Sequence, residues 1–198
     1  MDTSAGGRTT GHERDPTSRA PGDLELVRSF LALHEHHPDD PTSFPPSHGT
    51  LARWFRDASL LSPRARARQD DLGWADSVRE DLRSLVGAQT GSPGHRAAIA
   101  RLDAAAGAAS VTLRFGPTDL HPTAAGVHGA VGRLLAIAFL ARLDGSWDRL
   151  RHCSNPTCLS VFYDGSKNRS GRWCSMRACG NQAKVRAFRE RQRAEGAR

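Results

Sequence analysis

Two pairs of cysteines near the C-terminus constrain this chain more than any other feature of its sequence. Four residues separate the cysteines within each pair, and fifteen residues separate the two pairs; the 198-residue chain contains no cysteines besides Cys153, Cys158, Cys174 and Cys179. Thiolates in two close pairs, joined by a short loop, can surround a single tetrahedral zinc ion. The spacing therefore predicts one structural zinc site that organises the C-terminal region.

Four clustered cysteines could instead form two disulfides, bind an iron–sulfur cluster, or lie buried independently of one another. The first 22 residues contain no apolar run of the kind that directs secretion, so we expect the protein in the reducing cytoplasm, where disulfides are rare. An iron–sulfur cluster uses the same ligands and stays an alternative, whereas the clustering argues against independent burial. Zinc is preferred. Because four thiolates leave no open position for a water molecule, we expect a structural ion and no enzymatic activity.

The residues around the cysteines predict a knuckle, a hairpin and a helix. Asn155 and Pro156 favour a tight turn inside the first cysteine pair, and residues 159–163 read as a short strand. Turn-forming residues follow, and residues 172–173 lead into Cys174 as a second short strand. A helix is expected from Cys179 to about residue 193, so that this thiolate lies near the positive end of the helix dipole. Val185 and Phe188 are expected to pack on the hairpin.

At these residues the sequence resembles the CGNR zinc finger, a treble-clef-like module of bacterial proteins. The matching residues are Cys153-x4-Cys158, Phe162-Tyr163-Asp164, Trp173-Cys174-Ser175, Cys179-Gly180-Asn181 and Lys184. The arginine that gives the family its last letter is replaced by Gln182. Upstream, residues 23–145 resemble the ABATE domain that usually precedes this finger, through residues 23–27 and the segment 146–150 that leads into the finger. The resemblance implies a stress-responsive transcription regulator.

Positive charge is concentrated in the finger and its tail. The chain carries a net charge of +7, and residues 146–198 hold 12 Lys and Arg against 4 Asp and Glu. The remaining 16 basic and 17 acidic residues nearly balance over residues 1–145. A basic excess confined to one module is typical of a region that binds an anionic partner such as nucleic acid.

The terminal helix would align its basic residues. At about 100° per residue, Gln182, Arg186, Arg189 and Arg193 share one stripe, and Lys184 lies on a second edge. We expect DNA contacts from these residues and from four neighbours outside the helix, Lys167, Arg169, Arg172 and Arg177. Three alternatives stay open: the charges solvate a terminal helix, bind RNA, or bind a protein partner.

Upstream of the finger, hydrophobic residues recur at helical spacing. We expect helices over residues 23–37, 50–58, 64–86, 93–106 and 124–143, the last being the most apolar and therefore central. Alternating residues over 110–115 predict a strand, with a partner strand around 119–123. Residues 1–22 are polar and aperiodic and are expected to be disordered. A short helix over 146–152 would carry Trp147 and Leu150, which pack the finger against this body.

Histidines at the end of the first predicted helix invite a second metal hypothesis. His34 and His37 are three residues apart and precede Asp39 and Asp40, although a solvated helix end, or a ligand or partner pocket, explains the same residues. Trp74 is expected in the core. No apolar run reaches the ~20 residues that cross a bilayer, so no membrane partner is expected.

These features predict a mainly α protein with a small β-hairpin, divided into a tail (1–22), a helical ABATE-like domain (23–145) and a treble-clef-like four-cysteine finger (146–198). The predicted function is a DNA-binding transcription regulator whose helical domain senses a small-molecule ligand or forms a homodimer. The principal alternative is a zinc-stabilised adaptor that binds proteins and does not contact DNA. A further alternative is an enzyme whose pocket lies in the helical domain.

Overall fold

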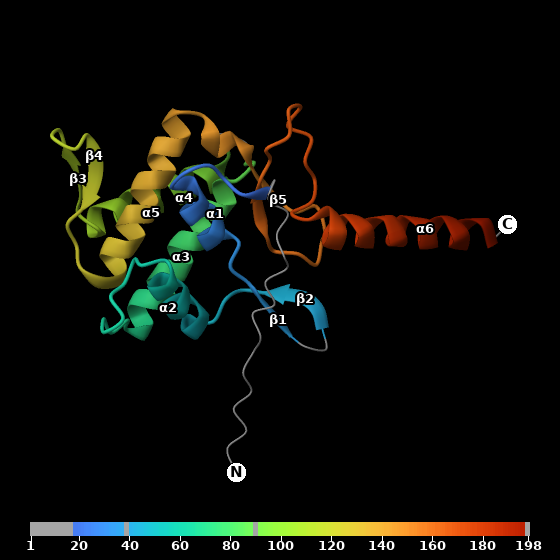
Figure 1. Ribbon diagram of the computed structural model, residues 1–198, viewed down its shortest axis with the longest axis horizontal. Helices are drawn as coiled ribbons and strands as arrows, with labels where there is room; N and C mark the ends of the chain where they lie inside the picture. The colour runs from blue at the N-terminus through green and yellow to red at the C-terminus, as the bar shows by residue number, and fades with distance from the viewer. Residues whose placement is uncertain (1–17, 38–39, 89–90, 197–198) are drawn as a thin grey trace, which may run out of the picture.

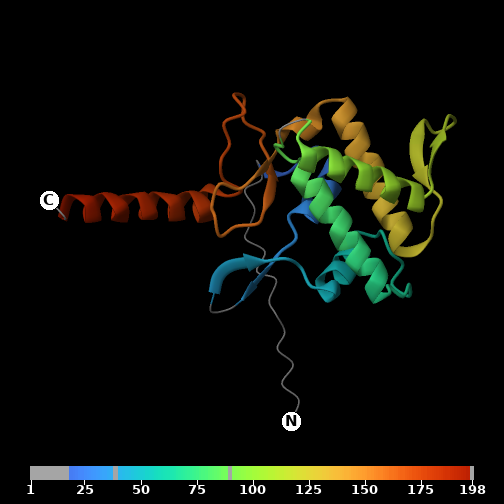
Figure 2. The same cartoon turned by 180° about the vertical axis from the view of Figure 1, so that it is seen from behind.

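The computed structural model describes residues 18–37, 40–88 and 91–196. A body of packed helices carries the cysteine-containing module on one side, and the last helix projects from that module as a straight rod (Figures 1 and 2). The described strands form three antiparallel pairs, two in the body and one in the finger. The predicted class, mainly α with a small β-hairpin in the helical domain and a C-terminal four-cysteine zinc finger, is confirmed; the body has a second hairpin that was not predicted.

Five helices build the body: α1 (Leu24–Leu31), α2 (His48–Asp57), α3 (Gln69–Leu85), α4 (Pro93–Ala108) and α5 (Gly126–Leu143). Ser47 and Ser92 cap α2 and α4, each accepting a hydrogen bond from the backbone N–H three residues on. Helix α3 begins five residues later than predicted, because residues after Ser62 form a turn in which the Ala65 N–H donates to the Ser62 carbonyl.

Helix α5 is the centre of the body. It packs against α1, α3 and α4, and ten of its residues are buried. Within the described part of the chain it alone is long and apolar enough to cross a membrane, and 56% of that window is buried inside the protein. An apolar helix covered on several sides is typical of a core. Trp74 of α3 is partly buried in this core and stacks on His128 of α5, with ring centroids 4.2 Å apart.

The hairpin predicted in the body is confirmed. Strands β3 (Val111–Arg114) and β4 (Asp119–Pro122) pair antiparallel, with Val111 opposite Pro122. The hairpin lies directly on α5 at Gly132, where an added Cβ would lie 2.7 Å from the Cβ atoms of Ala109 and Pro122. Only glycine allows this close approach of helix and strand.

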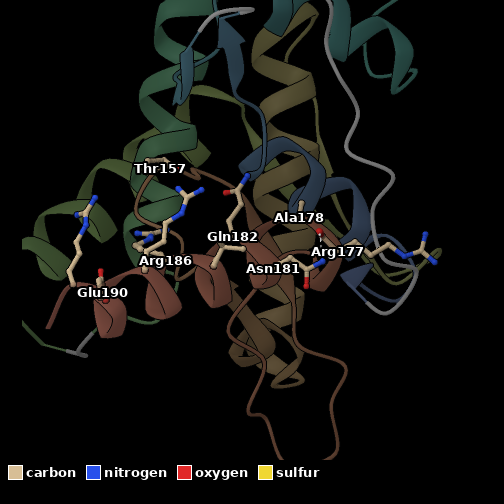
Figure 3. Close-up of a pocket in the computed structure, with 10 residues that line it drawn as sticks. Thr157, Arg177, Ala178, Asn181, Gln182, Arg186 and Glu190 are labelled. Atoms are coloured by element: carbon tan, nitrogen blue, oxygen red, sulfur yellow. Dashed lines mark hydrogen bonds between the residues drawn. The ribbon is translucent and has the colours of Figure 1, made fainter. Parts of the chain in front are cut away.

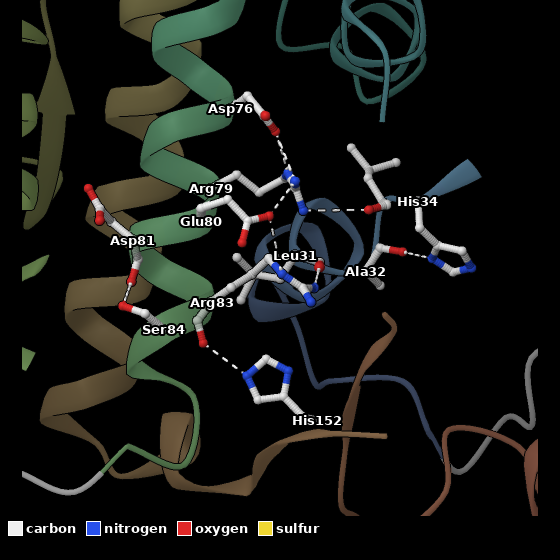
Figure 4. Close-up of polar contacts among 11 residues, drawn as sticks. Leu31, Ala32, His34, Asp76, Arg79, Glu80, Asp81, Arg83, Ser84 and His152 are labelled. Atoms are coloured by element: carbon white, nitrogen blue, oxygen red, sulfur yellow. Dashed lines mark hydrogen bonds and ion pairs between the residues drawn. The ribbon is translucent and has the colours of Figure 1, made fainter. Parts of the chain in front are cut away.

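The first predicted helix is too long. Helix α1 ends at Leu31, and residues predicted as its last turn form strand β1 (Glu35–His37), which pairs with β2 (Asp40–Phe44). Two arginines of α3 bind the carbonyls at this point: Arg83 donates to the Leu31 carbonyl and Arg79 to that of Leu33 at 3.5 Å (Figure 4). Side chains satisfy the carbonyls that a helix leaves open at its C-terminus, so the chain can turn away here.

Two predictions near the N-terminus concern residues that lie partly outside the described part of the chain. Residues 1–17 of the predicted disordered tail lie outside them, but Ser18 and Ala20 are only 6% and 8% exposed, and the Ala20 N–H donates to Glu25 Oε2 at 2.8 Å. The ordered chain therefore begins before residue 23, since this segment packs on α1. The metal hypothesis at His34 and His37 is untested, because the side chain of His37 is not among those described.

The finger is joined to the body through a shared core. A 3₁₀ turn (Ser146–Arg149) leads into β5 (Leu150–His152), so the helix predicted over 146–152 is wrong in its second half. Strand β5 pairs with β6 (Val161–Tyr163), which corrects the prediction that residues 172–173 form the partner strand. Trp147, Leu150 and Val161 are each at most 5% exposed and belong to the core of the body, as predicted for the first two.

Candidate zinc centre and nucleic-acid interface

The four cysteine sulfurs surround a common centre. All four Sγ atoms lie within 4.8 Å of one another, and Cys174 Sγ is 3.7 Å from both Cys158 Sγ and Cys179 Sγ. Sulfurs at the corners of a tetrahedron with Zn–S bonds of about 2.3 Å are about 3.8 Å apart. All four cysteines are free thiols, at distances far beyond a disulfide bond of about 2.05 Å. The donor set and its spacing fit one structural zinc ion.

Backbone hydrogen bonds hold the first cysteine pair in a knuckle between β5 and β6. The Cys153 N–H donates to the Ser160 carbonyl at 3.0 Å, and the Cys158 N–H donates to the Asn155 carbonyl at 2.9 Å. Residues 172–173, which were predicted as a strand, contribute one hydrogen bond: the Arg172 carbonyl accepts from the Ser154 N–H at 2.8 Å. These bonds hold the first cysteine pair beside the segment that leads into the second cysteine pair.

The second cysteine pair leads directly into the terminal helix. A π-helical turn (Met176–Gly180) precedes α6 (Asn181–Gly196), and Ser175 caps this turn by accepting from the Ala178 N–H at 3.3 Å. Cys179 is buried within the turn, two residues before the first residue of α6. The predicted position of this thiolate beside a helix N-terminus, where negative charge is favoured, is confirmed.

Crowding of the thiols shifts their acidity in opposite directions. Hydrogen bonding with Cys158 raises the pKa of the Cys153 thiol to about 12, and bonds with Cys153 and Cys158 raise the pKa of Cys174. The pKa of Cys158 is lowered, because Cys153 and Cys174 donate to it. Cys153 and Cys174 therefore stabilise a thiolate at Cys158. A dication at their centre would favour ionisation of all four.

The comparisons with known families follow this division of the chain. A family model named ABATE, with the description "Putative stress-induced transcription regulator", matches residues 23–145, more than half of the sequence. The chain belongs to the ABATE family. A second model, the CGNR zinc finger, matches residues 149–192 and includes all four cysteines. The predicted order, an ABATE domain followed by a CGNR finger, is confirmed. No curated protein matches the chain.

Five of the nine predicted nucleic-acid contacts line one groove of the CGNR finger. The groove has a volume of about 640 Å³ and follows one face of α6 (Figure 3). Its lining contains four arginines and one carboxylate; the residues are Thr157, Arg177, Ala178, Asn181, Gln182, Val185, Arg186, Arg189, Glu190 and Arg193. Positive charge predominates along it. The arrangement can receive an extended anion.

The other four predicted contacts do not line this groove. Lys184 is exposed on α6, while Lys167 and Arg169 are exposed in the loop that precedes the second cysteine pair. Arg172 is exposed too, and its guanidinium carbon lies 5.3 Å from the centre of the Trp173 ring, a cation–π contact. A single bound duplex would have to span the loop and the helix to touch all nine.

The prediction that Val185 and Phe188 pack on the hairpin is wrong. Their exposed fractions are 49% and 56%, because α6 projects away from the finger and is open to solvent along its length (Figure 1). Exposed apolar side chains on a basic helix can contact a bound partner.

Asn155 joins the knuckle to α6 and was not singled out as a site residue in the sequence. Its side chain is buried, donates to Gln182 Oε1 at 3.0 Å, and accepts from Arg186 Nη2 at 3.0 Å. It also lies 3.5 Å from Cys179 Sγ. The available signal was a turn-forming asparagine between two predicted ligands, which indicated a turn and gave no reason to expect contacts with residues 24 to 31 positions away.

Asp164 shapes the basic loop in a similar way. It is 2% exposed, and its carboxylate accepts from the N–H groups of Ser166 at 3.0 Å and Gly171 at 2.8 Å. Burial alone would raise the pKa of Asp164, but these hydrogen bonds outweigh it and lower the pKa below its ordinary value. Arg149 holds the same loop by donating to the carbonyls of Asp164 and Ser166.

Polar contacts fasten the finger to the ABATE domain. Arg28, 2% exposed in α1, donates to the Val161 carbonyl of β6 at 3.1 Å, while Glu25 binds its guanidinium through two oxygens, each at 2.7 Å. His152 Nε2 donates to the Arg83 carbonyl at the end of α3 at 3.0 Å (Figure 4). Burial lowers the pKa of His152, which favours the neutral ring. These contacts, together with the shared core, fix the finger on the body.

Proposed function

We propose that this ABATE-family protein is a transcription regulator that binds DNA through its CGNR finger. The observation that carries the proposal is the groove along α6, which begins next to the four-cysteine centre and is lined by Arg177, Gln182, Arg186, Arg189 and Arg193. Arginine binds phosphate oxygens through several N–H groups and suits bidentate recognition of guanine. Zinc would have a structural role here, without catalysis, and the regulator would act in the cytoplasm.

The shape of the finger supports this proposal. Helix α6 is exposed along its length and carries five Lys or Arg against two Glu. A helix that buries almost none of its surface in the protein is expected to gain stability from a partner. A duplex offers a groove wide enough for a helix and a row of phosphates on either side of it.

The ABATE domain would supply regulation, as a ligand-sensing or dimerisation module. Large apolar side chains are exposed on β3, on the turn that follows it and on the last turns of α5: Leu113, Phe115, Phe139, Leu140 and Leu143. Exposed apolar side chains of this size, on the hairpin or at the end of α5, are candidates for a surface of association. A homodimer formed there would hold two fingers at a fixed separation, which sets the spacing of half-sites on DNA.

Duplex binding measured against salt concentration tests the proposal. Four groove arginines that neutralise four phosphates give a slope of about −3.6 in log affinity against log salt. We expect Arg189→Ala to make the slope shallower by about 0.9, because one contact is lost. Arg142→Ala removes the same charge from an exposed position on α5 and should leave the slope unchanged. A wild-type affinity that does not respond to salt would contradict a role in DNA binding.

A protein-binding adaptor is the second candidate, and the exposure of Val185 and Phe188 on α6 favours it. Apolar anchors on a free helix are typical of segments that dock into a groove of another protein. Phe188→Ser separates the two functions. An adaptor would lose binding with this variant while keeping its charge, whereas phosphate-dominated DNA binding would change little.

A further inference from the structure

The amide of Asn155 uses its full hydrogen-bonding capacity between the zinc ligands and α6. It is 3% exposed and lies in the knuckle. Its Nδ2 group donates to Gln182 Oε1 at 3.0 Å and to Cys179 Sγ at 3.5 Å. Its Oδ1 atom accepts from Arg186 Nη2 at 3.0 Å and from Thr157 Oγ1 at 3.3 Å. A side-chain amide has two N–H donors and two acceptor lone pairs, so all four are used.

The chemistry of the neighbours permits one orientation of this amide. The guanidinium of Arg186 can only donate, so it must face Oδ1; a zinc-bound thiolate can only accept, so Cys179 as a zinc ligand must face Nδ2. The remaining N–H of Nδ2 then requires an acceptor, which Gln182 supplies through Oε1. If the Asn155 amide were reversed, its Nδ2 group would face the N–H groups of Arg186, and neither could accept a hydrogen bond. Residue 182 therefore has to present an acceptor in this chain.

We infer that Asn155 is the positioning residue that fixes Gln182 and Arg186 of α6 relative to the zinc ligand Cys179. Groups that donate hydrogen bonds to a metal ligand orient it and strengthen metal binding. The same amide orders the Arg186 side chain in the groove before any partner arrives, which reduces the entropy lost on binding. The consequence for DNA rests on the proposed function, whereas the link between α6 and the zinc centre does not.

Gln182, where the resemblance to the CGNR finger leads to the expectation of an arginine, fits this network. Glutamine gives Asn155 an acceptor, while an arginine at the same place would turn only N–H groups toward Nδ2. Gln182→Glu keeps an acceptor and Gln182→Met removes it. Because residue 182 is exposed, neither change disturbs the core.

The first experiment needs no DNA. We expect Asn155→Ala in the full-length protein to release zinc to a chelator about tenfold faster than wild type, since the hydrogen bond from the amide to Cys179 is lost. Amide hydrogen exchange in the first turns of α6 should accelerate in the same variant. Gln182→Met should shift both readouts in the same direction and Gln182→Glu should stay near wild type. Asn168→Ala, at an exposed position in the basic loop, is the matched control.

The second experiment is a double-mutant cycle on a mixed-sequence DNA duplex at low salt. Asn155→Ala leaves the net charge unchanged, so a loss of affinity must come from positioning. We expect a loss of about tenfold in the wild-type background and no further loss when Arg186→Ala is already present. Arg189→Ala should combine with Asn155→Ala multiplicatively, because these residues share no hydrogen bond among those described.

Two results would overturn the inference. One is zinc release and α6 exchange in Asn155→Ala and Gln182→Met that match those of wild type. The other is a pair of independent, multiplying effects for Asn155→Ala and Arg186→Ala. If the wild-type protein binds no duplex, the proposed function fails, and the zinc-release and exchange measurements decide the inference by themselves.

Discussion

At the scale of single residues, the finger depends on buried polar groups with several partners each. Asp164 accepts from two backbone N–H groups that are five residues apart in the loop, and so closes the segment that carries Lys167 and Arg169. A buried carboxylate left without these donors would cost far more than the bonds contribute, because its charge would remain desolvated. Asp164 therefore ties the two ends of the loop together, while Arg149 binds two of its backbone carbonyls.

The space beside Asp164 gives a prediction at Gly171. A Cβ added there would lie 2.8 Å from both Cγ and Oδ1 of the carboxylate, which is closer than such atoms approach. We expect Gly171→Ala to lower the free energy of unfolding by about 1–3 kcal/mol, measured by denaturant titration of the zinc-loaded protein. Gly116→Ala is the control, because a Cβ there meets nothing within 4 Å. Equal effects of the two changes would contradict this account of the loop.

The acidity of the cysteines predicts how zinc binding depends on pH. Hydrogen bonding raises the pKa of Cys153 to about 12 and also raises that of Cys174, so both carry protons over the ordinary pH range when zinc is absent. Zinc must displace these protons, and its affinity therefore increases as pH rises and decreases as pH falls. Competition with a chromophoric chelator between about pH 6 and pH 8 measures the trend. An affinity independent of pH would mean that thiols are not the ligands.

At the scale of elements, α6 differs from the body helices in what stabilises it. The body helices bury an apolar face in a common core, whereas Val185 and Phe188 of α6 stay exposed. The zinc centre and its hydrogen-bonded neighbours, rather than packing, therefore anchor this helix. Its direction is set at its N-terminal end.

Two phenylalanines test this difference. Phe188→Ser should change the free energy of unfolding by less than about 0.5 kcal/mol, since the side chain is 56% exposed. Phe55→Ala should cost about 3–5 kcal/mol, because Phe55 is fully buried and packs on Phe30 with ring centroids 5.7 Å apart. Thermal and denaturant unfolding of both variants measure the difference. A large loss at Phe188 would show that α6 packs on the finger in solution.

Local sequence patterns predicted the elements whose causes are local. The cysteine spacing predicted the site, the apolar run predicted α5, and alternation predicted β3 and β4. The early end of α1 could not be predicted, because the arginines that bind the carbonyls of Leu33 and Leu31 lie 46 and 52 residues further on. The same holds for Asn155, whose partners on α6 are 27 and 31 residues away. Long-range hydrogen bonds leave no periodic trace in a single sequence.

At the scale of the whole molecule, the finger and the ABATE domain share one core. Leu150 and Val161 of the finger are at most 1% exposed within it, and Arg28 of α1 binds the backbone of β6. Burial lowers the pKa of Arg83, and the carbonyl of the same residue accepts a hydrogen bond from His152 of the finger at 3.0 Å. The two parts are therefore expected to unfold together.

Zinc removal tests this cooperativity. Chelation should lower the melting temperature of the helical body by about 5 °C or more, because a loss of about 2 kcal/mol of packing shifts the midpoint by several degrees in a chain of this size. Calorimetry should show one transition with zinc bound, and added zinc should restore it. Two separate transitions, with the body unaffected by chelation, would mean that the shared core contributes little.

The central claim is that four sulfurs hold one zinc ion at the base of the basic helix. Zinc-edge X-ray absorption on the purified protein tests it most directly, because it reports the identity and distance of the atoms bound to the metal. We predict one zinc per chain with four sulfur neighbours at about 2.3 Å. Nitrogen or oxygen among the ligands, or fewer than four sulfurs, would contradict the account.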